Sequence, residues 1–189
     1  MNDDMKIIIA DRIPHKEECE EMMIRYSMLP NIIDHSRQVM RVCLAIIDNL
    51  HKDVSVNREL VIAAALLHDI TKTRSLRTKE KHAWSGGILL RTLGFPRIAE
   101  IVEQHVTLPD LNLDGQIEER EIVYYADKRV MHDRVVSIHE RVEDLIRRYA
   151  TGEDIRRRIM QNKEQTLAIE RKIARFMKLD IDEAIRLIS

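Results

Sequence analysis

The sequence predicts an all-α protein that folds as a single helical bundle. Glycine (5) and proline (4) are scarce among the 189 residues, which excludes turn-rich all-β folds and collagen-like chains. Hydrophobic residues (44%) and charged residues (33%) are present in the proportions of a globular protein, so disorder is also excluded. Apolar residues recur at helical spacing along most of the chain. The length suits one domain with one sizeable core.

The first part of the chain is predicted to contain two helices. The short apolar run at residues 7–9 is too short to be assigned. A first helix over 14–27 ends before Pro30, because a proline disfavours helical backbone in the residue that precedes it. Asn31 is expected to cap a second helix that runs to Leu50 and carries an apolar stripe.

The middle of the chain is predicted to hold one buried helix and two further helices. Residues 60–67 are apolar throughout, so this helix should be buried on every side. A polar, basic loop over 71–79 follows. A helix over 80–93 then ends at Gly94, in the position that glycine favours after a helix. Pro96 opens the next helix.

The last part of the chain is predicted to be helical as well. Residues 118–132 place apolar side chains on one face, and further apolar stripes follow over 135–149 and 151–178. Asp180 and Glu183 predict a capped, short final helix. The highly charged helix over 151–178 could act as a lid, as a brace across the bundle or as a dimer contact, and the sequence does not choose among these roles.

Charge and cysteine content narrow the class of protein. Lys and Arg number 31 against 32 Asp and Glu, so no overall field attracts nucleic acid or an anionic membrane. Cys19 and Cys43 lie far apart and indicate neither a disulfide framework nor a thiolate metal site. The chain begins without a signal peptide, and no apolar run is long enough to span a bilayer. These features predict a cytoplasmic protein that does not bind membranes.

The candidate chemistry lies in histidines and aspartates on faces that should be buried. They are distributed over four predicted helices and comprise His35, His68, Asp69, His105 and Asp127. Buried ionisable groups need partners, and neutral imidazoles and carboxylates meet that need most directly around a divalent cation. His82 is a sixth candidate, because the two glycines that follow it are easier to understand if something approaches the backbone closely.

Each of these residues, taken alone, has a simpler interpretation. A single histidine on an apolar stripe is more often a hydrogen-bonded core residue, and Asp127 alone could pair with Lys128 or Arg129. The ordered set shifts the balance, since six metal-type side chains are hard to satisfy in pairs within one core. The other histidines lack an apolar frame and are expected to be exposed: His15, His51, His132 and His139.

The sequence resembles the HD-domain metal-dependent phosphohydrolases, and in particular their HDIG-type, YqeK-like branch. The matching stretches span about half of the chain in the family's order. They are His35-Ser36-Arg37, Leu66 to Lys72 around His68-Asp69, His82-Ala83-x-x-Gly86, Gln104-His105 and Tyr125 to Lys128. The resemblance implies a bundle of the HD-domain type with an additional C-terminal helix.

The same resemblance implies a domain division and a metal centre. We expect an N-terminal helical segment over 1–30, an HD phosphohydrolase domain over 31–150 and a C-terminal helical extension over 151–189 packed on the same domain. In the family, the positions of four of the residues hold one metal ion, and the dinuclear form adds a second ion bridged by one of the aspartates. The ligand set carried over is His35, His68, Asp69 and Asp127 for the first ion, and Asp69, His82 and His105 for the second.

The chemistry of that ligand set predicts the cofactor and the reaction. A histidine-rich set suits two iron, manganese or zinc ions better than magnesium, which prefers oxygen ligands. A water that bridges two such cations loses its proton near neutral pH, and the resulting hydroxide can attack phosphorus in line. No protein nucleophile is required.

Basic residues near the candidate ligands are expected to contact phosphate. Lys72 stands one helical turn after the His-Asp pair and could stabilise phosphate oxygens or the leaving group, so Asp69 and Lys72 are the candidate catalytic residues. Arg74 and Arg37 are further candidates for substrate binding, although a charge run is usually a solvated surface. Trp84 could stack on a base, but a single tryptophan in a helix is more often part of the core.

The sequence therefore predicts a hydrolase of phosphoester or phosphoanhydride bonds in a nucleotide-like molecule, with dinucleoside polyphosphates as the preferred substrate. Nucleoside monophosphates and cyclic dinucleotides are alternatives within the same chemistry. A non-catalytic sensor that binds a metal and a nucleotide is an alternative of another class, and a structural protein with core histidines is a third. The expected partner is a phosphorylated small molecule; nucleic acid is not expected, and a homodimer stays open.

Overall fold

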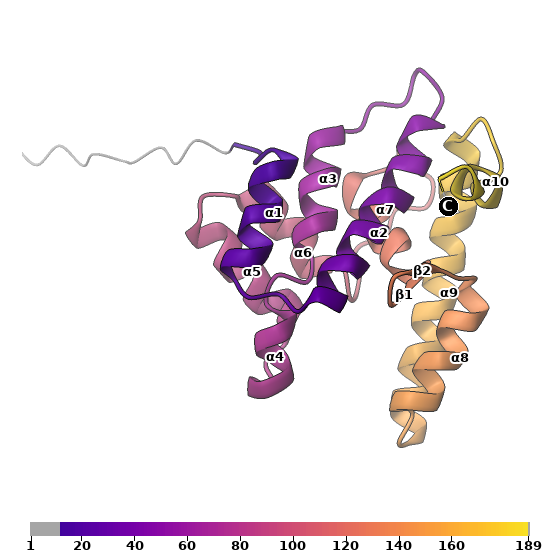
Figure 1. The fold of residues 1–189 in the computed structure, drawn as a ribbon. Coiled ribbons are helices and arrows are strands. Elements are labelled where there is room, and N and C mark those ends of the chain that lie inside the picture. The colour runs from indigo at the N-terminus through magenta and orange to yellow at the C-terminus, as the bar shows by residue number, and fades with distance from the viewer. Residues whose placement is uncertain (1–11, 189) are drawn as a thin grey trace, which may run out of the picture.

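The computed structural model describes residues 12–188 and confirms the all-α class (Figure 1). The unassigned run at 7–9 lies outside the described residues, as does most of the sequence before the first helix. The elements in chain order are α1 (Lys16–Arg25), α2 (Pro30–Asp48), α3 (Arg58–Leu67), α4 (Lys72–Thr78), α5 (His82–Thr92), α6 (Pro96–Gln104), α7 (Glu119–Lys128), β1 (Val130–Met131), β2 (Arg134–Val135), α8 (Ile138–Tyr149), α9 (Glu153–Phe176) and α10 (Ile181–Arg186).

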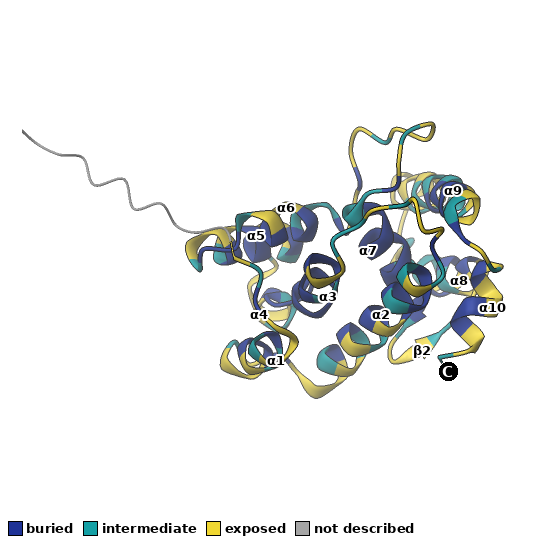
Figure 2. Ribbon diagram, turned by 90° about the horizontal axis from the view of Figure 1, so that it is seen from above, coloured by how far each residue is buried: buried dark blue, intermediate teal, exposed yellow. Residues whose placement is uncertain are grey.

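Helix α3 is the centre of the bundle, as its all-apolar sequence predicts. Figure 2 shows it surrounded by the other helices of the body, and it packs against α1, α2, α6 and α7. Three consecutive alanines, Ala63 to Ala65, are fully buried, and their small side chains let the neighbouring helices approach closely. Asn57 caps the helix by accepting a hydrogen bond from the Leu60 amide at 3.0 Å.

The start of α2 differs from the sequence prediction. Pro30 occupies the first turn of the helix and Leu29 is the residue before it, so Asn31 lies inside the helix and does not cap it. Proline is favoured here because its fixed φ angle suits the first turn and its missing N–H would have no partner there. Gly94, by contrast, ends its helix as expected, with a φ of 86° that favours glycine.

A short helix, α4, replaces the loop that was expected over 71–79. Its polar sequence has no apolar period that could reveal a helix. It is stabilised locally: the Ser75 hydroxyl donates to the Lys72 carbonyl, and Arg74 pairs with Glu80 just beyond the helix. Lys79 ends it in the left-handed conformation, with a φ of 62°.

A two-stranded antiparallel hairpin replaces the end of the helix that was expected over 118–132. Helix α7 ends at Lys128, and Val130 pairs with Val135 and Met131 with Arg134. His132 lies in the turn with a φ of 59°. Strands of two residues are too short to show an alternating pattern in the sequence, which is why the prediction for this segment was wrong.

Helices α8 and α9 pack side by side and extend away from the body of the bundle (Figure 1). The second half of α9 is tied to α7 by buried polar contacts. The Lys172 ammonium donates to both oxygens of Glu121 at 2.7 and 2.8 Å, and the Tyr125 hydroxyl donates to Glu170 at 2.6 Å. These contacts hold the second half of α9 against the bundle, as a brace would, and the roles of lid and dimer contact stay predictions.

Helix α10 begins as its sequence predicts. The Asp180 carboxylate accepts hydrogen bonds from the amides of Asp182 and Glu183, and Arg129 binds the Asp182 carboxylate at 2.6 Å. Within residues 12–188, no helix is both long enough and apolar enough to cross a membrane.

Candidate metal centre

The ends of five elements meet at one place in the bundle and bring the six candidate ligands together. His68 and Asp69 directly follow α3, and His105 directly follows α6. Asp127 lies in the last turn of α7, while α2 and α5 contribute one histidine each near their first residues. The set is therefore His35, His68, Asp69, His82, His105 and Asp127.

The side-chain atoms of these residues lie within a few ångströms of one another. Asp69 is the common neighbour: its oxygens lie 3.6 Å from His68 Nε2, 3.2 Å from His82 Nε2 and 3.6 Å from His105 Nε2. Asp127 Oδ1 lies 3.1 Å from Nε2 of His35 and 3.7 Å from that of His68. The convergence that the sequence pattern predicts is therefore present in the fold.

Two groups of side chains have the spacing of a metal site. One consists of His35, His68 and Asp127, and the other of His68, Asp69 and His105. His68 belongs to both groups, whereas the family resemblance assigns it to the first ion alone. His82 completes the second group through its short distance to Asp69.

Backbone carbonyls fix the orientation of three imidazoles. Nδ1 of His35 lies 2.8 Å from the His132 carbonyl, Nδ1 of His68 lies 2.7 Å from that of Ala65, and Nδ1 of His105 lies 2.6 Å from that of Val102. Because a carbonyl oxygen only accepts hydrogen bonds, each Nδ1 must carry a proton. In the neutral ring, Nε2 then presents its lone pair to the centre of the cluster, as metal-binding histidines do.

The unpaired Nε2 of His68 is the strongest structural evidence that the site fits a cation. This atom is buried and has no hydrogen-bond partner in the described part of the chain. Its lone pair faces oxygens of Asp69 and Asp127, which also only accept when ionised. Such an arrangement is unfavourable in a buried site without positive charge between the acceptors. The mixed imidazole and carboxylate donors fit a divalent transition metal.

Burial and charge keep the cluster in the protonation states that bind metals. Burial lowers the pKa of His68 to about 4 and that of His82 to about 3, so both rings are neutral at pH 7. For Asp69 and Asp127, burial alone would raise the pKa, but nearby histidines and lysines outweigh it and hold both values well below the usual range. Both carboxylates are therefore ionised.

Two lysines balance the negative charge of these carboxylates. Lys72 Nζ lies 3.5 Å from Asp69 Oδ1 and 3.3 Å from His82 Nε2. Lys128 Nζ donates to Asp127 Oδ2 and to the carbonyl of His105, both at 2.7 Å. The pairing of Asp127 with Lys128, which the sequence offered as an alternative to metal binding, is therefore present. It uses Oδ2 of Asp127, whereas Oδ1 faces the histidines of the cluster. Lys128 was missed as a site residue, although it directly follows an expected ligand.

Two other contacts that position the ligands were also missed. Thr71 is buried, and its hydroxyl donates to the His82 carbonyl at 2.7 Å and contacts the Ser85 hydroxyl at 2.9 Å. The turn at His132 supplies the carbonyl that holds His35. The first could be suspected from a threonine two residues after the His-Asp pair, whereas the second depends on a hairpin that the sequence did not reveal.

The glycines after His82 are explained by the approach of α6. A Cβ atom on Gly86 would lie 3.1 Å from a methyl group of Val102, and one on Gly87 would overlap the side chain of Glu103. The sequence predicted that some group approaches this backbone closely, and in the structure that group is formed by side chains of α6.

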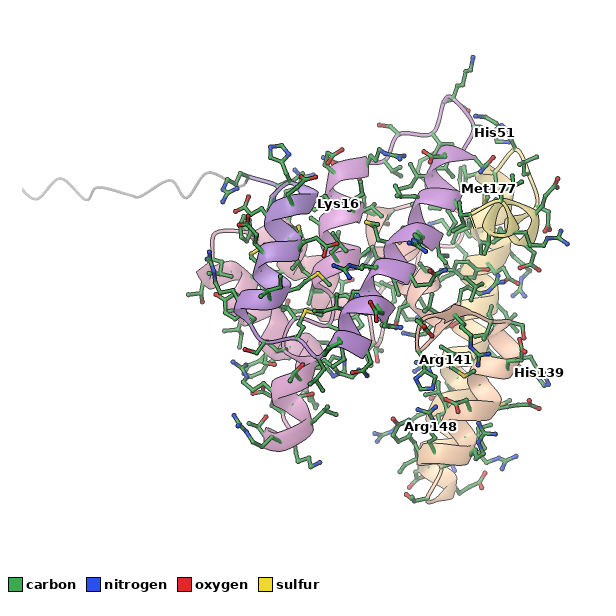
Figure 3. All side chains as sticks on the ribbon, in the orientation of Figure 1. Lys16, His51, His139, Arg141, Arg148 and Met177 are labelled. Atoms are coloured by element: carbon green, nitrogen blue, oxygen red, sulfur yellow. The ribbon has the colours of Figure 1, made fainter. Side chains whose placement is uncertain are left out.

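The remaining candidate residues lie outside the cluster. Arg37 pairs with Glu20, and Arg74 with Glu80, so their contact with phosphate stays a prediction. Trp84 is 62% exposed, which makes the expectation of a core tryptophan wrong. The other histidines are exposed as predicted: His15, His51, His132 and His139. Figure 3 shows His51 beyond the end of α2 and His139 on the outer side of α8.

Comparison with known proteins places this geometry in a family. A family model described as HD domain matches residues 32–131, more than half of the chain. The chain therefore belongs to the HD domain family. The HDIG-type, YqeK-like branch within it stays a prediction.

Two curated relatives share sequence with this chain. A protein of Thermoplasma volcanium named tRNA (cytidine(56)-2'-O)-methyltransferase is 28% identical over 145 residues, which cover 70% of this chain and 41% of the relative. A protein of the same name from Picrophilus torridus is 29% identical over 141 residues, which cover 68% of this chain and 40% of the relative. The chain thus spans about two fifths of the length of these relatives. No solved structure matches it at a significant level.

Proposed function

We propose that this HD-domain chain is a metal-dependent phosphohydrolase that cleaves a phosphoester or phosphoanhydride bond of a nucleotide-like substrate. The observation that carries the proposal is the unpaired, buried Nε2 of His68 between two ionised carboxylates. A histidine that only packs in a core would have a hydrogen-bond partner for this atom.

Six side chains would hold two iron, manganese or zinc ions. The first ion would take His35, His68, Asp69 and Asp127, and the second would share Asp69 and add His82 and His105. When bound, such ions supply positive charge that polarises phosphate oxygens and makes a nearby water more acidic.

Residues of the chain would provide the other contacts that the reaction needs. Asp69 lies close to three imidazoles and would be shared by the two ions, and Lys72 would donate a hydrogen bond to a phosphate oxygen or to the leaving group. The Lys72 side chain is about one third exposed, so it can reach a substrate at the surface. Arg74 and Arg37 are proposed as weaker substrate contacts that would first have to leave their acidic partners.

Dinucleoside polyphosphates remain our preferred substrates, with nucleoside monophosphates and cyclic dinucleotides as close alternatives. The names of the two relatives favour a second candidate, in which the phosphate is carried by a tRNA. Because this chain covers only about two fifths of those proteins, the methyl transfer in their names is not part of the proposal. A sensor that binds a nucleotide without hydrolysing it would share the ligands and lack turnover.

Hydrolysis by the metal-loaded protein, followed by chromatography of the products, tests the proposal. The substrates are a panel of mononucleotides, dinucleoside polyphosphates, cyclic dinucleotides and tRNA. We expect cleavage of at least one class, and its loss after chelation or in His68→Ala and Asp69→Ala. His139→Ala is the matched control, because this histidine is exposed and lies outside the cluster. Full activity in either cluster variant, or in metal-stripped protein, contradicts the mechanism.

We also propose that the protein works in the cytoplasm. Both cysteines are free and buried, which suits a reducing compartment.

The domain division at 31–150 stays part of the proposal, and the family match lies within that range.

A further inference from the structure

A pocket of about 600 Å³ opens next to the candidate metal centre, between α5, the segment after α6 and the first half of α9. His82 forms part of its wall and is also one of the six candidate ligands. The pocket therefore borders the candidate metal centre at His82. Its volume falls within the range of about 300–1,000 Å³ that is typical of small-molecule sites.

One wall of the pocket offers an unusual amount of exposed apolar surface. Trp84 is 62% exposed and Val106 is 39% exposed, and both line the pocket. Exposing a tryptophan to water forgoes the free energy of burying a large aromatic ring. A flat ring that stacks on Trp84 in the pocket would cover the indole and recover this free energy. Every nucleobase is a flat ring of this kind.

The part of the pocket lining that α9 contributes offers hydrogen-bonding groups without partners. It is formed by Arg158, Gln161 and Asn162 of α9, whose side chains make no hydrogen bond or ion pair with any other residue from 12 to 188. Each carboxamide can donate and accept, as the edge of a nucleobase requires, and the guanidinium can only donate. Glu103 also lines the pocket, but its carboxylate is paired with Arg91.

From these features we infer that the pocket binds the base of the substrate, stacked on Trp84, while the phosphate lies at the metal centre. This inference rests on the proposed function and names the substrate class as one that carries a nucleobase. The α9 side chains then determine which base is preferred. The shared ligand chemistry is a nucleoside, which can belong to a free nucleotide or to the end of an RNA strand.

The fluorescence of Trp84 provides a direct test, because it is the only tryptophan in the chain. We would titrate the metal-loaded protein with adenosine, cytidine and, as a base-free probe, ribose 5-phosphate. We expect saturable quenching by at least one nucleoside and none by ribose 5-phosphate. Absence of quenching by both nucleosides up to millimolar concentration, or equal quenching by ribose 5-phosphate, overturns the inference.

A short oligoribonucleotide distinguishes the two sources of the base. If it quenches Trp84 at lower concentration than the matching nucleoside, the inference holds with an RNA end as the ligand. If the nucleoside binds as tightly as the oligoribonucleotide or more tightly, the inference holds with a free nucleotide as the ligand. Neither titration needs turnover, so a protein that hydrolyses phosphate without quenching refutes only this inference, and one that is quenched but inactive refutes only the proposed hydrolysis.

Variants of the aromatic wall test the stacking contact by calorimetry. Trp84→Leu should raise the dissociation constant of the nucleoside at least about fivefold, since stacking on an aromatic ring is worth about 1–3 kcal/mol and 1.4 kcal/mol is a factor of ten. Trp84→Phe should retain most of the affinity. Met160→Ala, in α9 but outside the pocket lining, is the matched control. Unchanged affinity in Trp84→Leu overturns the inference.

Discussion

Replacing Lys172 by methionine should destabilise the protein strongly, because it would leave a buried carboxylate without its cation. Lys172 is 1% exposed and Glu121 is fully buried. The ammonium donates to both Glu121 oxygens and to the Asn112 carbonyl, at 2.7 to 2.8 Å. After the substitution, Glu121 would keep only the hydrogen bond from the Glu118 amide at 2.9 Å.

The magnitude follows from the burial of the pair. Breaking a buried ion pair by removing one partner typically costs about 3–5 kcal/mol, a large part of the roughly 5–15 kcal/mol that stabilises a domain. For a chain of this size, 1 kcal/mol lowers the melting temperature by about 2–4 °C. We therefore expect a decrease of about 6–20 °C, measured by circular dichroism, together with a lower urea midpoint.

A double variant separates the charge from the packing. Glu121→Gln removes the negative charge but retains an oxygen that can accept from the Glu118 amide. Combined with Lys172→Met, it should recover much of the stability, and a double-mutant cycle would measure the coupling between the two residues. A loss below about 1 kcal/mol in Lys172→Met alone, or strictly additive effects in the cycle, would refute the reasoning.

Three further predictions concern the metal centre and its surroundings. Manganese at about 100 times its dissociation constant should stabilise the protein by about 2.7 kcal/mol, seen as a higher melting temperature that His68→Ala abolishes; an equal shift in that variant would place the ion elsewhere. Thr71→Val should lower the free energy of unfolding by about 1–3 kcal/mol, because the His82 carbonyl loses the hydrogen bond from Thr71 and the buried Ser85 hydroxyl loses a partner, and urea denaturation at wild-type stability would contradict this. Burial raises the pKa of Cys19 to about 12 and that of Cys43 further still, so neither thiol should react with iodoacetamide at pH 8 until the protein unfolds. Since both pKa values are higher in the folded state, their contribution to stability is complete below pH 9 and decreases as the pH rises above it.

The fold class and the convergence of the candidate ligands could be predicted because their signals are local in the sequence. The apolar run at 60–67 can only be a buried helix in a chain of this composition, and His68 and Asp69 follow it directly. His105 lies in register with the apolar positions of the helix before it. In each case, the helical period carries the ligand to the buried side of its own helix, so the sequence alone indicates which side chains enter the core.

Other features depend on contacts between distant segments. The hairpin at 130–135 packs against α2, where the His132 carbonyl accepts a hydrogen bond from His35. Trp84 was expected in the core because a single tryptophan in a helix is more often part of it, yet this side chain lines the pocket between α5 and α9.

What the sequence by itself determined is the helical bundle and the identity of the residues that can bind metal, because periodicity and side-chain chemistry are properties of each segment. Only the tertiary structure decided that His68 would lie between Asp69 and Asp127 without a hydrogen-bond partner for Nε2, that Lys172 would neutralise Glu121, and that α9 would form a wall of the pocket. These arrangements join residues far apart in the chain, and they are selected by the packing of whole helices and not by the sequence near any one of them.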